Sequence, residues 1–181
     1  MRVIFEPLPI PGAFRIRLAR LGDERGFFAR RFSADLFAEQ GLETDFVQRS
    51  VSFNARRGTL RGLHFQIAPH AETKLVRCTR GAAFDVLADL RAASSMRGRW
   101  HGEEISADNR TILYIPAGVA HGFQTLADAT EIDYEITPAY APEAARGVRH
   151  DDPTLAIDWP IAERIMSARD LSWPGLQAAG R

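Results

Sequence analysis

Short runs of alternating hydrophobic and polar residues dominate the chain between residues 13 and 138. In the run 13–19, Phe14, Ile16 and Leu18 fall on one face of an extended strand, and arginines take the other face. Many short strands of this kind, separated by turn residues, predict an all-β sandwich or barrel. The further strand-like runs are 45–54, 73–80, 82–91, 100–107, 111–116, 120–126 and 130–138.

Helical patterns are confined to short segments. One begins near Ser33, a suitable N-cap, and ends at Gly41, a suitable C-cap. After residue 138 the composition shifts to proline, alanine and charge, and 161–171 has room for one short helix. We expect a single domain over residues 1–181, with a β core at about 13–138 and a C-terminal extension at about 139–181.

Length and charge exclude several classes of protein. The 181 residues are 45% hydrophobic and 25% charged, which is ordinary for one globular domain. The net charge is zero, so we expect no partner among nucleic acids or acidic membranes. No apolar run approaches the roughly 18 residues of a membrane span, and prolines break the N-terminal segment, which does not resemble a signal peptide. With Cys78 as the only cysteine, we expect a soluble cytoplasmic protein.

Two polar side chains fall on apolar strand faces. Lys74, the only lysine of the chain, shares a face with Val76 and Cys78, and Tyr134 lies between two isoleucines. A buried ammonium is costly unless it is paired. These residues therefore line a polar cavity, or Lys74 reaches solvent at a rim and Tyr134 is a core ring with a satisfied hydroxyl.

The segment 58–66, GTLRGLHFQ, also contains polar residues within an apolar run. In a regular strand, Arg61 and His64 would lie on opposite faces of an otherwise apolar run. Gly62 between them would permit a bulge that turns both side chains toward one cavity. The alternative is a half-buried histidine that is hydrogen-bonded to the backbone.

A second histidine lies in PAGVAH (116–121), whose PxGxxH form resembles the second metal-binding motif of cupins. The first cupin motif, a glycine followed by H-x-H, is incomplete, because Gly58 and His64 fit but Gln66 replaces the second histidine. A metal site needs three or four good ligands. Only His64 and His121 qualify, so we predict a cupin-like barrel that has lost its metal.

Nine segments, in order, resemble the dTDP-4-dehydrorhamnose 3,5-epimerase family of nucleotide-sugar enzymes, from about residue 5 to about residue 176. The resemblance implies a cupin-like jelly-roll barrel with a few short peripheral helices, and an epimerase that needs neither cofactor nor metal. The segments are DERGFF (23–28), FVQ (46–48), GTLRGLHFQ (58–66), KLVRC (74–78), FDVLADLR (84–91), LYIPAGVAHGF (113–123), YAPEAARGVRHDDP (140–153), IDWP (157–160) and SARDLSWP (167–174).

The resemblance also implies roles for the matching residues. His64 resembles the general base and Asp170 its carboxylate partner, whereas Tyr134 resembles the acid on the opposite face of the sugar. Lys74 resembles the cation that stabilises the enolate. Arg25 and Arg61 resemble the ligands of the diphosphate. The other positions that the resemblance places around the substrate are Gln48, His121, Glu143 and Arg169.

The expected partners are a nucleotide-diphosphate sugar and a second copy of the chain, since the family is typically dimeric. Five residues depart from those that rhamnose-pathway members usually carry: Arg30, Arg49, Ser50, Glu135 and Arg169. They leave open the nucleotide base, the sugar, and whether C3, C5 or both are inverted. Two alternatives also stay open, a metal-dependent cupin enzyme and a sugar-binding jelly-roll module without turnover.

Overall fold

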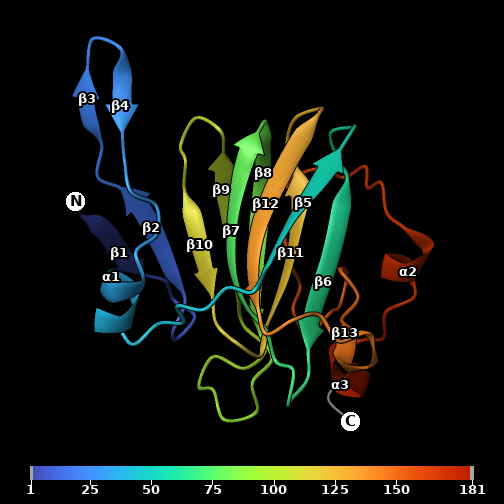
Figure 1. Ribbon diagram of the computed structural model, residues 1–181. Helices are drawn as coiled ribbons and strands as arrows, with labels where there is room; N and C mark the ends of the chain where they lie inside the picture. Colours follow the sequence, from blue (N-terminus) through green and yellow to red (C-terminus); the bar gives the residue numbers. More distant parts are fainter. Residues whose placement is uncertain (1, 180–181) are drawn as a thin grey trace.

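Two antiparallel sheets packed face to face form the body of the protein (Figure 1). The structure is a computed structural model that describes residues 2–179. The six-stranded sheet has the order β1-β2-β10-β7-β12-β5 and the five-stranded sheet the order β13-β6-β11-β8-β9. This arrangement confirms the predicted all-β jelly-roll barrel with short peripheral helices.

The strands of the six-stranded sheet are β1 (Val3–Pro7), β2 (Phe14–Leu18), β10 (Ile112–Ile115), β7 (Thr73–Arg80), β12 (Thr130–Thr137) and β5 (Gln48–Asn54). Those of the five-stranded sheet are β13 (Ala145–Gly147), β6 (Leu60–Gln66), β11 (Val119–Thr125), β8 (Ala82–Asp89) and β9 (Trp100–Ser106). The remaining elements are the hairpin of β3 (Leu21–Asp23) and β4 (Gly26–Phe28), and the helices α1 (Ala34–Glu39), η1 (Pro142–Ala144), α2 (Ala168–Leu171) and α3 (Leu176–Ala179).

The core lies between the two sheets. Val76 and Ile132 of the six-stranded sheet pack against Leu87 and Phe123 of the five-stranded sheet. Both outer faces are also partly covered: α1 packs onto the six-stranded sheet through Phe37, and the C-terminal extension packs onto the five-stranded sheet. Successive residues of a strand point to opposite faces of the sheet, and here both faces are at least partly buried. This explains why β6 and β8 are rich in apolar residues.

The strand runs predicted between residues 13 and 138 are all present, with ends that differ by a few residues. The predicted helix at 33–41 is α1, and 161–171 contributes only the single turn of α2. The pattern missed β1, β13 and the β3–β4 hairpin. No helix within residues 2–179 has the length and apolar character needed to cross a membrane.

A bulge in β6 places the two polar residues of the GTLRGLHFQ segment on one side of the strand. His121 of β11 pairs with His64 and Phe123 pairs with Arg61, so β6 has one residue more than β11 over this stretch. Gly62 has a φ of 123°, and a Cβ there would lie 2.5 Å from the Cα of Gly122. Only glycine fits this position, and the predicted bulge is confirmed.

Candidate active site

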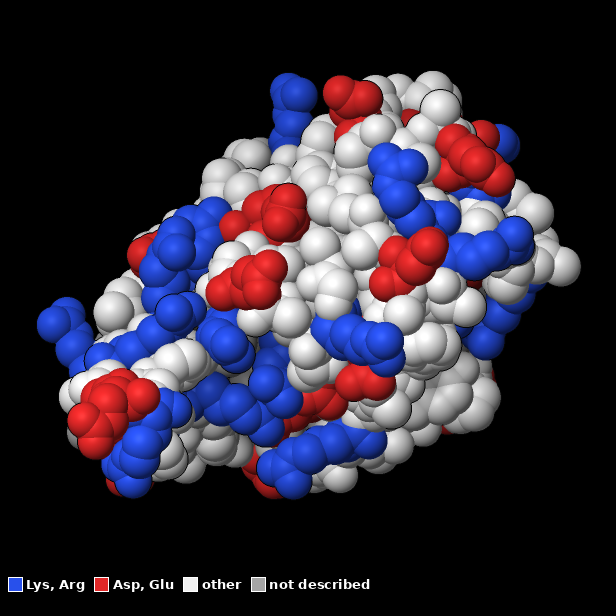
Figure 2. Space-filling model, turned by 90° about the horizontal axis from the view of Figure 1, so that it is seen from above, with Lys and Arg blue, Asp and Glu red and all other residues white. Residues whose placement is uncertain are grey.

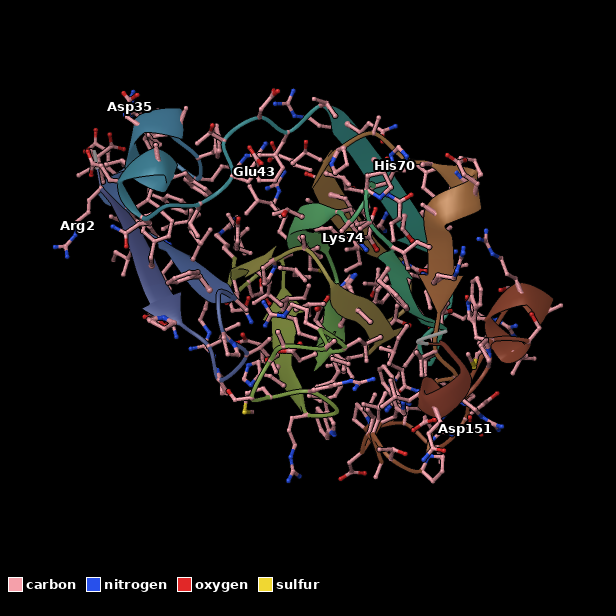
Figure 3. All side chains as sticks on the ribbon, turned by 90° about the horizontal axis from the view of Figure 1, so that it is seen from below. Arg2, Asp35, Glu43, His70, Lys74 and Asp151 are labelled. Atoms are coloured by element: carbon pink, nitrogen blue, oxygen red, sulfur yellow. The ribbon has the colours of Figure 1, made fainter. Side chains whose placement is uncertain are left out.

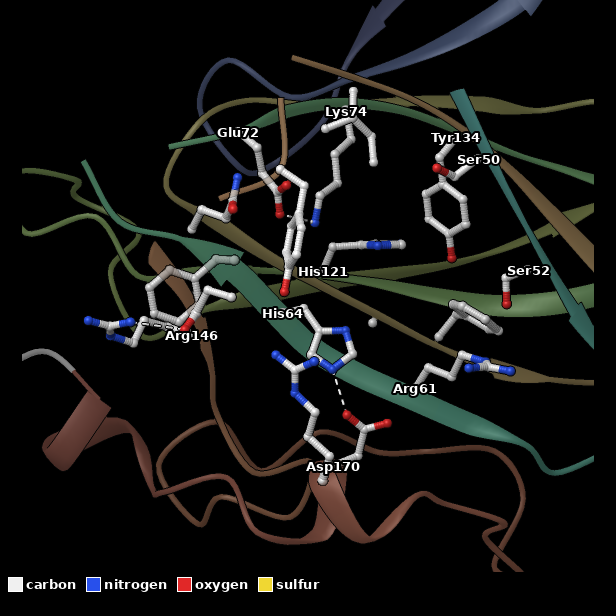
Figure 4. Close-up of a pocket in the computed structure, with 18 of the residues that line it drawn as sticks. Ser50, Ser52, Arg61, His64, Glu72, Lys74, His121, Tyr134, Arg146 and Asp170 are labelled. Atoms are coloured by element: carbon white, nitrogen blue, oxygen red, sulfur yellow. Dashed lines mark hydrogen bonds and ion pairs between the residues drawn. The ribbon is translucent and has the colours of Figure 1, made fainter. Parts of the chain in front are cut away.

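A cavity of about 430 Å³ opens between the two sheets (Figure 4). The five-stranded sheet contributes His64 and His121 to its wall, and the six-stranded sheet contributes Lys74 and Tyr134. Asp170 closes the side next to β6 from the C-terminal extension. Residues from distant parts of the chain therefore face one another across a partly enclosed space.

His64 and Asp170 form a hydrogen-bonded dyad with 2.6 Å between Nε2 and Oδ1. Asp170 is fixed by its own surroundings, since its backbone N–H donates to Ser167 Oγ and Trp173 Nε1 donates to its Oδ1 at 3.3 Å. Burial alone would raise the pKa of Asp170, but the hydrogen bond to His64 and the nearby imidazole charge outweigh burial and hold the pKa below its ordinary value. Asp170 is thus ionised at neutral pH and orients the imidazole through this hydrogen bond.

A second dyad, His121 with Asp85, lies deeper in the same wall. The His121 Nε2 is 2.8 Å from Asp85 Oδ2, and both side chains are buried. We did not single out Asp85 from the sequence, although it shares strand parity with Ala83 and Leu87, which are core residues. Its carboxylate interrupts an apolar strand face, and this pattern could have identified it as a candidate site residue.

Tyr134 presents its phenol from the opposite wall (Figure 4). Its ring meets His121 edge-on, with 6.1 Å between ring centroids. Burial and the negative charge of Asp85 raise the pKa of Tyr134 well above its ordinary value, and the charge of Arg61 offsets only part of this. The phenol therefore keeps its proton at neutral pH and is available as an acid.

Lys74 supplies a positive charge on the same wall as Tyr134. Its Nζ lies 2.8 Å from Glu72 Oε1, and the two side chains are 7% and 9% exposed. The buried ammonium is thus paired, as its position on an apolar face requires. Lys74 does not reach solvent at a rim, so the cavity interpretation of this residue is confirmed.

Three arginines bring positive charge to the cavity: Arg61, Arg146 and Arg169. Within residues 2–179 none of the three is within ion-pair distance of a carboxylate. Arg61 donates to the neutral amide oxygen of Asn54 at 2.7 Å, Arg146 donates to backbone carbonyls, and Arg169 stacks on Trp173. Since Lys74, His64 and His121 each have a carboxylate, the arginines carry the uncompensated charge, which suits a polyanionic ligand.

Three of the predicted substrate-contacting residues do not line this cavity: Arg25, Gln48 and Glu143. Gln48 begins β5, and its side-chain oxygen accepts a hydrogen bond from the backbone N–H of Tyr140. Glu143 lies in η1 with a largely exposed side chain. Arg25 is at the turn of the β3–β4 hairpin, which projects beyond the sheets (Figure 1), and its side chain is 84% exposed.

The described residues do not form a metal site of the cupin kind. His64 and His121 each direct Nε2 at an aspartate, and Glu72 pairs with Lys74. Nowhere between residues 2 and 179 do three His, Cys, Asp or Glu side chains converge as ligands. His64, His121 and Glu72, the donors that a cupin metal would use, are therefore each held by a different partner side chain.

Two of the residues that differ from those usual in the family form an ion pair with each other. Arg49 of β5 stands directly opposite Glu135 of β12, and their side chains form an ion pair at 3.3 Å. Arg31 also pairs with this buried glutamate. Arg49 is therefore explained by a cross-strand ion pair, without appeal to the nucleotide.

Comparison with known proteins agrees with this geometry. A model of the dTDP-4-dehydrorhamnose 3,5-epimerase family matches residues 7–178. The dTDP-4-dehydrorhamnose 3,5-epimerase of Sinorhizobium fredii is 43% identical over 95% of this chain and 89% of its own. The dTDP-4-dehydrorhamnose 3-epimerase of Streptomyces niveus is 38% identical over 91% and 79%. The crystal structure of dTDP-4-dehydrorhamnose 3,5-epimerase from Elizabethkingia anophelis has a TM-score of 0.95 at 35% identity and covers 99% of both chains. These matches confirm the resemblance of the nine segments, and the chain belongs to the dTDP-4-dehydrorhamnose 3,5-epimerase family.

Proposed function

We propose that this chain inverts C3 and C5 of the 4-keto sugar in dTDP-4-dehydro-6-deoxyglucose. Epimerase chemistry, and with it the isomerase class, follows from the family. One observation carries the proposed roles: His64 with Asp170 on one wall of a cavity and Tyr134 on the other. Inversion of a carbon requires a proton to leave on one face and to return on the opposite face, and this arrangement provides both.

The proposed reaction uses the acidity of carbons next to a carbonyl. His64 removes the proton from the carbon, and the electron pair moves onto O4 to give an enolate. The Lys74 ammonium stabilises the negative oxygen in a site with little water. The Tyr134 phenol then delivers a proton to the same carbon from the other face, which re-forms the ketone with inverted configuration. Before the second carbon reacts, the His64 imidazolium releases its proton to solvent and the Tyr134 phenolate takes a proton up. The same steps then follow at the second carbon, and no step uses a redox cofactor.

Solvent exchange tests the proposal. The protein is incubated in heavy water with dTDP-4-dehydro-6-deoxyglucose, and the sugar protons are followed by NMR. We expect the C3 and C5 signals to disappear as the product forms. Loss of only one signal would restrict the chemistry to one carbon, as the name of the Streptomyces niveus relative implies for that protein. No exchange with any nucleotide-linked 4-keto sugar would contradict the proposal.

The two alternatives that the sequence left open are not favoured. A metal-dependent cupin would use His64 and His121 as ligands, but both are held by carboxylates. A binding module without turnover has no need of a base and an acid on facing walls. Both alternatives also disagree with the enzymes to which the chain is similar along nearly its whole length.

We predict that Asn54→Asp weakens substrate binding. The neutral amide of Asn54 holds Arg61 without cancelling its charge, and a carboxylate at 2.7 Å would cancel it. A hydrogen bond to a charged group contributes about 1.5–3 kcal/mol, so Kd for dTDP should rise about tenfold or more. Calorimetric titration with dTDP measures this.

Asn54→Ser is the matched control for this prediction, because a hydroxyl also accepts from Arg61 and carries no charge. It should bind dTDP far more tightly than Asn54→Asp does. Equal affinities for the two variants would show that Arg61 is not the residue that recognises the diphosphate.

We also propose a homodimer in which the β3–β4 hairpin carries Arg25 to the cavity of the partner. The hairpin exposes Leu21 and Phe28, and the edge strand β5 exposes Val51 and Phe53, of which Val51 lines the cavity. Packing one apolar surface on the other would cover both and close the free edge of β5. Figure 2 shows Lys and Arg side chains spread over this face of the molecule, with Asp and Glu side chains among them. A cytoplasmic location stays a prediction, supported by the nucleotide-sugar substrate.

Mixed dimers test whether Arg25 acts in the cavity of the partner subunit. We expect Arg25→Ala and His64→Ala homodimers each to be poorly active at low substrate concentration. When the two chains are co-expressed with different tags, each purified heterodimer has one site with both changes and one with neither, so it should recover about half of the wild-type activity. If Arg25 serves its own chain, every site of the heterodimer is defective, and the activity stays low.

A further inference from the structure

Lys74 is the only lysine of the chain, and Figure 3 shows it inside the barrel, whereas Arg2, Asp35 and Asp151 lie at the periphery. In the sheet it pairs with Ile115 and Ile136 on the neighbouring strands, and neither supplies charge. An ammonium in this position has lost most of its contact with water. It therefore depends on a counter-charge within the cavity.

Glu72 provides that counter-charge. It lies just before β7, two residues ahead of Lys74, and Figure 4 shows its carboxylate next to the Lys74 ammonium. The carboxylate lines the same cavity, is equally buried, and lies 2.8 Å from Nζ. No other group that faces the cavity takes the place of Glu72 as a counter-charge. Asp170 is paired with His64, and Asp85 is paired with His121. The remaining charged or titratable groups carry no negative charge at neutral pH: Tyr134, Arg61, Arg146 and Arg169.

We infer that Glu72 is a positioning residue that keeps Lys74 protonated and fixed at the cavity wall. The inference rests on the proposed function, in which the Lys74 ammonium stabilises the enolate oxygen. A buried ammonium without a counter-charge gives up its proton, because desolvation disfavours the charged form. A neutral amine would leave the enolate unstabilised. Glu72 prevents this loss and holds the ammonium in one place through a charge-assisted hydrogen bond.

The single lysine makes the inference directly measurable. Protein grown with lysine labelled with ¹³C at Cε and ¹⁵N at Nζ gives one side-chain NMR signal, and this signal reports the ionisation of Lys74 without substrate. In Glu72→Gln we expect the titration midpoint of the signal to fall by about one pH unit or more relative to the wild type. Glu103→Gln is the matched control, since Glu103 is a comparably buried, ion-paired glutamate outside the cavity. There the midpoint should not move.

Activity provides a second readout. In Glu72→Gln, kcat should fall mainly at alkaline pH, where the unpaired lysine is neutral, and less at lower pH. If Glu72→Gln does not fold, Glu72→Asp keeps the charge but withdraws it by one methylene, and a smaller shift of the midpoint is expected. An unchanged lysine midpoint, or an equal loss of kcat at every pH, would overturn the inference. Failure of the proposed function is distinguishable, because the wild type would then turn over no nucleotide sugar while the lysine signal still responded to Glu72→Gln.

Discussion

His64→Ala is expected to lose the solvent exchange of both sugar protons, with rates about 10²–10⁴-fold below the wild type. His64 is the more exposed of the two dyad histidines, and Asp170 orients its ring through a contact of 2.6 Å. The same base serves C3 and C5 in the proposed reaction, so both signals should persist in heavy water. NMR of the sugar protons measures the two rates in one experiment.

His70→Ala is the control for this variant. His70 lies in the loop after β6, where its side chain is partly exposed, and it does not line the cavity. Its removal should leave both exchange rates unchanged. Exchange that survives in His64→Ala at one carbon only would assign the other carbon to a different base, for which the deeper dyad of His121 and Asp85 is the candidate. Exchange that survives at both carbons would contradict the role of His64.

The β core could be predicted because its strands alternate or carry uninterrupted apolar runs. The elements that were missed lack such a pattern. Every residue of β3 and β4 is exposed, so no buried face marks the hairpin. Prolines at the end of β1 and just after it conceal a strand that pairs only along one edge.

Parts of the site could be predicted from strand parity alone. Lys74 and Tyr134 interrupt apolar faces, and the same rule applies to Asp85, which the sequence reading overlooked. The bulge at Gly62 was predictable because a strand with Arg61 and His64 on one side requires an extra residue. In each of these cases the signal lies within a few residues of the functional side chain.

Other parts of the site depend on contacts that no local pattern encodes. Asp170 is 106 positions from His64 and reaches it only because the C-terminal extension packs on the five-stranded sheet. Its assignment came from family resemblance. Arg49 and Glu135 were separate departures in the sequence and became one ion pair only when the register of β5 and β12 was known. Tertiary packing, which is set by the whole chain, decides such pairs.

Tyr134→Phe is expected to separate proton exchange from inversion. The variant keeps His64, Asp170 and Lys74, so the proton can still leave and the enolate can still form. Without the phenol on the opposite wall, His64 returns a solvent-derived proton to the face from which it took one. The sugar should therefore exchange its protons with heavy water while retaining its configuration, and inversion should slow by about 10²–10⁴-fold. NMR reads exchange from the loss of proton signals and inversion from the coupling constants of the product.

Tyr114→Phe is the matched control, because Tyr114 is a buried tyrosine of β10 whose hydroxyl accepts a hydrogen bond from the backbone N–H of Glu43 outside the cavity. It should exchange and invert at wild-type rates. Inversion at the wild-type rate in Tyr134→Phe would mean that another acid serves the second face. Loss of exchange together with inversion would mean that the phenol supports the base or the enolate instead. The expected result is exchange without inversion, and it requires a base and an acid that act from opposite walls of the cavity. The two sheets place His64 and Tyr134 on opposite walls.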